Sequence, residues 1–144
     1  MRKVLVLNGP NLGRLGRRQP EIYGHTTHAE LVAQCQAWGR DLGLEVTVLQ
    51  TNHEGVLLDA LNQAADEQTP VVLNGGAWSH YSYALFDACA QLTAPLVEVH
   101  LSDPKQRPEV FRHHSVITPH AAAEYVGQGV EGYRSALEFI ANAD

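Results

Sequence analysis

The chain has 144 residues, 44% of them hydrophobic, and a formal net charge of −6. This length predicts one domain over residues 1–144, with a core large enough to fold without disulfides. No run of about 18 apolar residues is present to span a membrane, and the negative charge argues against general nucleic-acid binding.

Five short apolar runs predict the strands of one sheet. The first four are rich in valine and leucine, which is typical of parallel strands buried on both faces. The fifth is short, and we expect it to be an edge strand. The predicted strands are residues 3–7, 44–50, 70–74, 95–101 and 114–119.

Helical patterns fill the intervals between these runs. The first helix is predicted to begin after Thr27, because Glu30 three residues later completes a capping box, and to stop at Gly43. The other helices are expected in 54–68, in 79–92 with Ser79 as the N-cap, and towards the end of 123–144. The residues expected to face the core from the first two helices are Leu31, Cys35, Trp38, Leu42, Leu57, Leu58, Leu61 and Ala65.

The alternation of strands and helices predicts an α/β fold with right-handed crossovers. With five strands, its simplest form is a flavodoxin-like three-layer α/β/α sandwich with a five-stranded parallel sheet. In such folds ligands bind at the carboxyl ends of the strands. The loops after the first four strands are rich in polar residues, namely Asn8, Asn11, Asn74, His80, His100 and Ser102.

Most of the basic residues fall in two clusters, which suggests a small anionic ligand. Solvated loop charge is the alternative interpretation. The clusters are Arg2, Lys3, Arg14, Arg17 and Arg18 near the N-terminus, and Lys105, Arg107 and Arg112 after the fourth strand.

Several common site types lack support. No Walker phosphate loop follows the first strand, and "GQGVEG" at 127–132 has the spacing of a dinucleotide-binding loop but no closely preceding predicted strand, so we interpret its glycines as turn or packing residues. The histidine pairs 25/28 and 113/114 have no further ligand at a familiar metal spacing. Cys35 and Cys89 form no C-x-x-C pair and are expected to be buried thiols, which favours a reducing, cytoplasmic location.

Tyr23 stands out because Arg17 and Arg18 lie shortly before it in the same glycine-rich loop. A nearby guanidinium favours the phenolate form of a tyrosine. A phenolate could remove a proton next to a carbonyl, and Asn11 could help to stabilise the resulting enolate. The alternative is that Tyr23 only packs and that the arginines are solvated.

Glu98 and His100 are two residues apart on the fourth strand and so share one face of the sheet. A carboxylate that holds an imidazole orients it as a general acid. A buried histidine with a purely structural partner is the alternative. A base in one loop and an acid on a neighbouring strand together describe an elimination of water.

Five segments, in this order and spacing, resemble the type II 3-dehydroquinate dehydratases over nearly the whole chain. They are "NGPNLGRLGRRQPEIYG", "QTNHEG", "LNGGAWSH", "APLVEVHLS" and "FRHHS". The resemblance implies a flavodoxin-like fold and the reversible anti dehydration of 3-dehydroquinate to 3-dehydroshikimate through an enolate. It implies no cofactor, metal or Schiff base.

The resemblance also implies roles for single residues. Tyr23 would be the base, Arg18 would hold it as a phenolate, and Asn11 would stabilise the enolate through a water molecule. His100, supported by Glu98, would protonate the departing hydroxyl. The residues implied in substrate binding are Asn74, the backbone of Leu101 and Ser102 with the Ser102 hydroxyl, His80, Arg112, and Asp87 of a neighbouring subunit.

The family assembles as trimers grouped into dodecamers, and residues 11–23 would form a lid. The sequence departs from the common pattern at Tyr81, at Phe86 and in 103–112, which reads one residue longer and leaves a contact by Arg107 in doubt. It does not distinguish shikimate biosynthesis from quinate breakdown. Two other classes remain open at this point: a binding module for an anion without turnover, and a phosphate- or flavin-binding protein.

Overall fold

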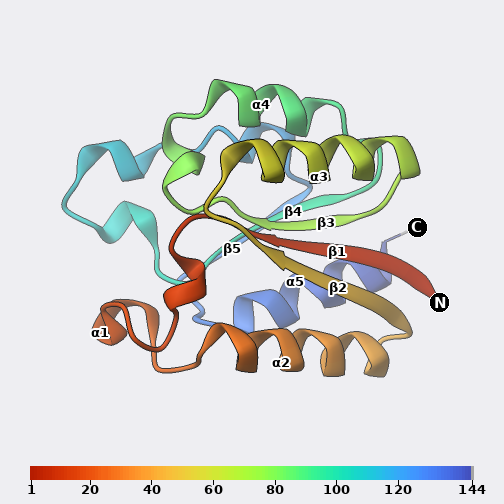
Figure 1. The fold of residues 1–144 in the computed structure, drawn as a ribbon, viewed down its shortest axis with the longest axis horizontal. Coiled ribbons are helices and arrows are strands. Elements are labelled where there is room, and N and C mark those ends of the chain that lie inside the picture. Colours follow the sequence, from red (N-terminus) through yellow and green to blue (C-terminus); the bar gives the residue numbers. More distant parts are fainter. Residues whose placement is uncertain (144) are drawn as a thin grey trace.

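A computed structural model describes residues 1–143 as a five-stranded parallel sheet between two layers of helices (Figure 1). The strand order is β2-β1-β3-β4-β5, which is the order of flavodoxin-like sheets. The predicted fold class is therefore confirmed. The strands are β1 (Arg2–Asn8), β2 (Leu44–Gln50), β3 (Val71–Asn74), β4 (Leu96–His100) and β5 (Ala123–Val126).

The helices cover both faces of the sheet, with α2 and α5 on one side and α3 and α4 on the other (Figure 1). Side chains alternate along each strand, so that Val6 packs towards α2 and α5 while its neighbour Leu7 packs towards α3 and α4. The helices are α1 (Pro20–Tyr23), α2 (His28–Asp41), α3 (Glu54–Glu67), α4 (Tyr83–Ala90) and α5 (Glu131–Asn142). In residues 1–143, none of these helices has the length and apolar character needed to cross a membrane.

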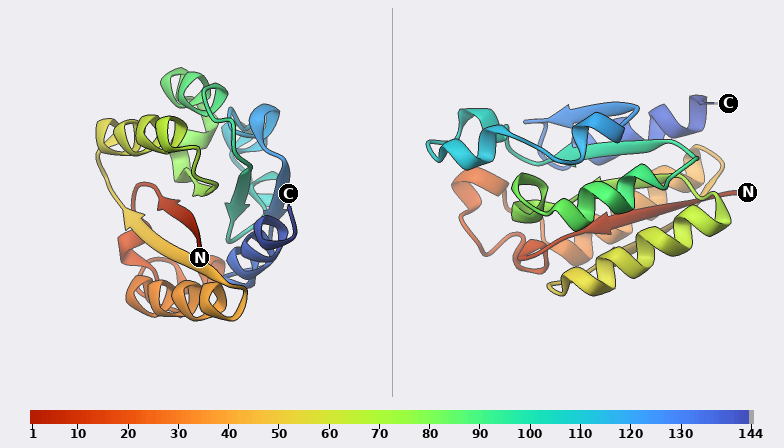
Figure 2. Two further views of the ribbon diagram at one scale, coloured as in Figure 1. Left: turned by 90° about the vertical axis from the view of Figure 1, so that its right-hand side faces the viewer. Right: turned by 90° about the horizontal axis from the view of Figure 1, so that it is seen from above.

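The carboxyl ends of the strands meet at one edge of the sheet, away from both termini (Figure 2). Two long connections cover this edge: the segment after β1, which holds α1, and the segment after β4, which holds the short 3-10 turns η3 (Pro104–Gln106) and η4 (Val110–His113). Asn8 and Asn74 are register partners at the ends of β1 and β3. Gly9 then lies so close to the next loop that a Cβ atom would stand 2.7 Å from the carbonyl oxygen of Gly75.

The first predicted helix is confirmed in detail. The Thr27 hydroxyl accepts from the Glu30 amide at 3.2 Å, and the Glu30 carboxylate accepts from the Thr27 amide at 3.0 Å, which is the predicted capping box. Gly43 follows the helix with a left-handed φ of 75°. Leu31 and Cys35 are buried, and Trp38 and Leu42 pack partly buried against the same core.

Two helix predictions need correction. Ser82, not Ser79, caps α4, because the Ser82 hydroxyl accepts from the Leu85 amide, while Ser79 lies in the preceding 3-10 turn η2 (Gly76–His80). On α3 the fully inward positions include Ala64 where the sequence pattern indicated Ala65, and Leu58 is only partly buried.

The fifth predicted strand, 114–119, is wrong. Val116 and Ile117 are buried, but they pack with the α3 and α4 side of the core instead of joining the sheet. Pro119 lacks an amide proton for a strand ladder, and it lies in the 3-10 turn η5 (Thr118–His120). The fifth strand of the sheet is instead β5, a half-exposed segment that pairs with β4 in parallel and forms the edge opposite β2.

The glycines at 127–132 do follow a strand directly, contrary to the sequence interpretation, because β5 ends at Val126. The backbone amides of Gly127 and Gly129, however, already donate to carbonyl groups of the protein and are not free to bind a phosphate. Gly127 donates to the carbonyl of His100 at 3.2 Å, and Gly129 donates to that of Leu101 at 3.0 Å. Both glycines have a left-handed φ, so they are turn residues, and they fasten α5 to the exit of β4.

A test of the packing between α2 and β2 is Gly39→Ala. A Cβ atom at position 39 would lie 2.4 Å from Cγ2 of Val46, a stiff side chain on β2. We expect the free energy of unfolding to fall by about 1–2 kcal/mol in denaturant titration. Gly55→Ala on α3, where the added methyl group meets no atom within 4 Å, should cost nothing. Shortening Val46 to Ala removes the clashing atom, so Gly39→Ala should then cost less. If Gly39→Ala lowers the free energy of unfolding equally in the native background and in a Val46→Ala background, this explanation is wrong.

Candidate active site

Most of the residues that the sequence singled out surround one cavity at the carboxyl edge of the sheet. Its lining comes from the segment after β1, the loop after β3 and the segment after β4. Glu98 does not line this cavity but is bonded to His100, which does, and Asp87 is exposed on α4 and is not part of the lining. The predicted site residues that line the cavity are Asn11, Arg18, Tyr23, Asn74, His80, His100, Leu101, Ser102 and Arg112.

The entry to the loop after β1 is fixed by the loop after β2. Asn11 has a left-handed φ of 68°, which asparagine tolerates better than most residues. The backbone amide of Asn11 donates to Oδ1 of Asn52 at 2.9 Å. Gln50 donates from Nε2 to both the Gly9 carbonyl and Asn52 Oδ1, each at 3.1 Å. The "QTNHEG" segment thus holds Asn11 at the cavity.

Tyr23 lies between two guanidinium groups. Nη1 of Arg107 donates to the Tyr23 hydroxyl at 2.8 Å, and the Arg18 guanidinium carbon stands 4.8 Å from the centre of the tyrosine ring. His113 donates from Nε2 to the Arg107 carbonyl at 2.8 Å and so fastens the segment that carries this arginine. The structure therefore brings Arg107, which the sequence left in doubt, into direct contact with Tyr23.

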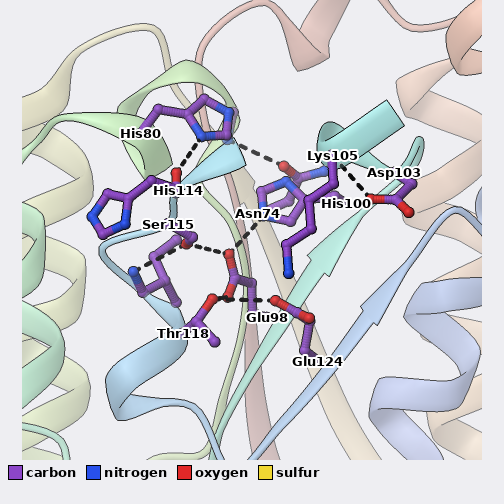
Figure 3. Close-up of polar contacts among 12 residues, drawn as sticks. Asn74, His80, Glu98, His100, Asp103, Lys105, His114, Ser115, Thr118 and Glu124 are labelled. Carbon is purple, nitrogen blue, oxygen red and sulfur yellow. Dashed lines mark hydrogen bonds and ion pairs between the residues drawn. The ribbon is translucent and has the colours of Figure 1, made fainter. Parts of the chain in front are cut away.

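The carboxylate of Glu98 is fully buried and accepts three hydrogen bonds (Figure 3). His100 donates from Nε2 at 2.7 Å, and the hydroxyls of Ser115 and Thr118 each donate at 2.5 Å. Burial alone would raise the pKa of this carboxyl, but the bonds from His100, Ser115 and Thr118 outweigh it and hold the pKa below its usual value. Glu98 is therefore an anion, and it engages Nε2 of His100, which leaves Nδ1 as the free ring nitrogen.

His80 is oriented by the backbone. Its Nδ1 lies 2.7 Å from the His114 carbonyl, which can only accept, so Nδ1 carries the proton. Burial lowers the pKa of His80, although the bond to the His114 carbonyl acts the other way. A neutral His80 with a proton on Nδ1 offers the lone pair of Nε2 as an acceptor to a ligand hydroxyl.

Sequence reasoning missed the residues that hold these groups in place. Ser115 and Thr118 lie in a segment predicted as a strand. The segment turns instead, and this brings both hydroxyls to Glu98. Their position beside the carboxylate could have been suspected from the unusual burial of an acidic residue in a strand. The other missed residues are Gln50, Asn52 and His113, whereas Arg107 is named from the sequence with its contact left in doubt.

The model of the class II dehydroquinase family matches residues 2–141. The chain belongs to the class II dehydroquinase family. A 3-dehydroquinate dehydratase from Salinispora tropica is 60% identical over 139 residues, which are 96% of each chain. One from Mycobacterium tuberculosis is 53% identical over 138 residues, covering 96% of this chain and 93% of the relative.

The solved structures agree with the family assignment. A type II dehydroquinase from Propionibacterium acnes superposes with a TM-score of 0.96 at 52% identity, covering 99% of this chain and 98% of the other. A second, from Butyrivibrio crossotus, gives a TM-score of 0.93 at 40% identity, over 96% and 97% of the chains. The protein therefore has the activity of a 3-dehydroquinate dehydratase, which is a lyase.

The buried Glu98 carboxylate makes a testable contribution to stability. Its pKa is lower in the folded protein than in the unfolded chain, so its contribution is present above the unfolded value and is lost as the pH falls through the folded value. Ser115→Ala removes one donor and raises the folded pKa. We expect this variant to lose about 2 kcal/mol of unfolding free energy at about pH 7, and less at about pH 4.

The measurement is denaturant unfolding at both pH values. Ser135→Ala is the matched control, because the Ser135 hydroxyl bonds to the Gln128 side chain on the surface. A loss in Ser115→Ala that stays constant with pH would contradict a role in holding the ionised carboxylate.

Proposed function

We propose that the dehydration proceeds by proton abstraction at Tyr23 and proton donation at His100. The observation that carries this proposal is the pairing of two prepared groups across one cavity: a tyrosine hydroxyl bonded to Arg107 at 2.8 Å and a histidine bonded to a buried carboxylate at 2.7 Å. Both Tyr23 and His100 line the same cavity.

Abstraction of the proton from C2 of 3-dehydroquinate is the task of the Tyr23 phenolate. Arg107 and Arg18 stabilise the phenolate by charge, one at the oxygen and one over the ring. The electron pair left by the proton forms an enolate with the neighbouring carbonyl. Asn11, held at the cavity by Asn52, stabilises that enolate through a water molecule.

Loss of the hydroxyl completes the elimination. His100 in its protonated form gives the proton on Nδ1 to the departing oxygen, while Nε2 keeps its bond to Glu98. The enolate collapses, the carbon–oxygen bond breaks, and water and 3-dehydroshikimate leave. Tyr23 and His100 each end the cycle neutral, and exchange with solvent restores both.

The substrate is held through its carboxylate and its ring hydroxyls. Asn74, the backbone amides of Leu101 and Ser102, and the Ser102 hydroxyl surround the carboxylate. The Gly127 and Gly129 amides bond to the carbonyls of His100 and Leu101 and so support that backbone. His80 accepts from one hydroxyl at Nε2, and Arg112 donates to another.

The assembly and location of the enzyme extend the same proposal. Asp87 is exposed on α4 and does not line the cavity of its own chain. We therefore propose trimers, grouped into a dodecamer, with Asp87 completing a neighbouring site. Residues 11–23 act as a lid, and closure excludes water from the enolate. Two buried free cysteines favour a cytoplasmic location.

Tyr23→Phe tests the base. The variant keeps the aromatic ring and its contacts but has no group that can take the proton. We expect kcat to fall by at least about a thousandfold, measured as the rise in ultraviolet absorbance from the conjugated enone of the product, with a chelator present throughout. Tyr125→Phe, which removes a hydroxyl from β5 outside the cavity, is the control. A Tyr23→Phe enzyme of near-normal kcat would refute the assignment.

Arg107→Met tests the second guanidinium. The substitution keeps the length of the side chain while it removes the donor and the charge at the Tyr23 hydroxyl. We expect kcat to fall about a hundredfold in the same absorbance assay. Arg134→Met is the control, because Arg134 forms an exposed ion pair with Glu138 on α5. If Arg107→Met changes only KM, the arginine binds substrate and does not act on the base.

A further inference from the structure

A chain of buried hydrogen bonds runs from the cavity through the protein to the start of α2. The Asn74 Nδ2 donates to the Tyr133 hydroxyl at 3.0 Å, and that hydroxyl donates to Asn8 Oδ1 at 2.6 Å. Asn8 Nδ2 stands 3.1 Å from His28 Nε2. Tyr133 and Asn8 are fully buried, and Asn74 is nearly so, so each polar atom depends on its partner. The proposed reaction uses only Asn74 of these four residues.

The donor and acceptor roles along this series of hydrogen bonds are fixed at one end by a backbone amide, which can only donate. The Gly76 backbone amide donates to Asn74 at 3.2 Å, so the atom it meets is the amide oxygen Oδ1. Nδ2 of Asn74 therefore faces Tyr133, whose single proton must go to an acceptor on Asn8. Asn8 Nδ2 in turn faces His28, which must accept and is therefore neutral at Nε2. Burial lowers the pKa of His28, which agrees with a neutral ring.

The orientation of Asn74 decides what the cavity offers to an anion. Nδ2 carries two protons, and Tyr133 takes one of them, which leaves the second for a ligand in the cavity that Asn74 lines. A reversed amide would turn a carbonyl oxygen towards the same ligand and repel a carboxylate. Burial raises the pKa of Tyr133, so its hydroxyl keeps its proton and remains the partner that this orientation needs.

We propose that Tyr133, with Asn8 and His28 behind it, is a positioning residue that keeps the Asn74 amide turned to receive the substrate carboxylate. The proposal rests on the proposed role of Asn74. It predicts an effect on substrate affinity and not on the chemical step, because Tyr133 meets neither the proposed base nor the proposed acid.

Tyr133→Phe tests the proposal in the intact enzyme. The phenyl ring fills the same space in the core, while Asn74 Nδ2 loses its acceptor and Asn8 Oδ1 loses its donor. We expect KM for 3-dehydroquinate to rise about tenfold while kcat changes less than about threefold. Tyr125→Phe, which removes a hydroxyl from a tyrosine packed against the same core, should leave both constants unchanged. A folded Tyr133→Phe enzyme with an unchanged KM, or with only kcat reduced, would overturn the proposal.

Asn74→Ala separates this proposal from the one on which it rests. If Asn74 binds the carboxylate through the orientation that Tyr133 imposes, Asn74→Ala raises KM, and adding Tyr133→Phe raises it no further. Two additive increases would mean that Tyr133 acts elsewhere, which overturns the positioning role alone. An unchanged KM in Asn74→Ala would overturn the carboxylate assignment and the positioning role together.

His28, at the other end of this series of hydrogen bonds, gives an independent test if Tyr133→Phe does not fold. His28 is only half-buried, at the first residue of α2, and so tolerates substitution. His28→Leu removes the acceptor and frees Asn8 to turn, so KM should rise severalfold. His28→Gln restores an acceptor oxygen and should restore KM. Equal KM values in the Leu and Gln variants would overturn the proposal.

Discussion

The buried carboxylate of Glu98 is the charge around which the carboxyl end of the sheet is organised. An ionised group in a fully buried position carries a large desolvation cost, which only several well-placed donors offset. Three donors surround it here, and they come from two places in the chain: His100 on the same strand, and Ser115 and Thr118 on the segment that follows η4. The position of the proposed acid and the path of that segment therefore have one cause.

This constraint explains the main failure of the sequence interpretation. "HSVITP" has the apolar residues of a strand, and the only local argument against one is Pro119 at its end, which lacks an amide proton. The path of the segment is set instead by the hydroxyl donors that it supplies to Glu98, together with the burial of Val116 and Ile117 against the α3 and α4 layer. The edge position beside β4 is occupied instead by "AEYV", a half-exposed segment of four residues with no strong hydrophobic pattern. Such short edge strands are fixed by the partner strand more than by their own sequence.

The parts that sequence predicted well are those with a local cause. The first helix starts and stops where its capping box and glycine indicate, and β1 to β4 follow their valine and leucine runs within a residue or two. The gathering of polar loops at one edge follows from parallel topology alone. Contacts between segments far apart in the sequence could not be predicted from it. Arg107 meets Tyr23 across 84 positions, and Tyr133 meets Asn8 across 125.

The surroundings of Tyr23 differ in kind from those of Glu98. Helix α1 has only four residues, too few to be stable alone, and it starts after Gln19, whose φ of 40° is unfavourable for a residue with a side chain. Tertiary contacts must therefore hold it, and the bond from Arg107 is the one that reaches the tyrosine oxygen itself. Arg107 belongs to the segment after β4, so the two loops must meet before the tyrosine has its full set of positive neighbours. The contact between the two loops therefore also completes the surroundings of the proposed base, whereas Glu98 and the proposed acid lie on one strand and are joined by a bond that involves neither loop.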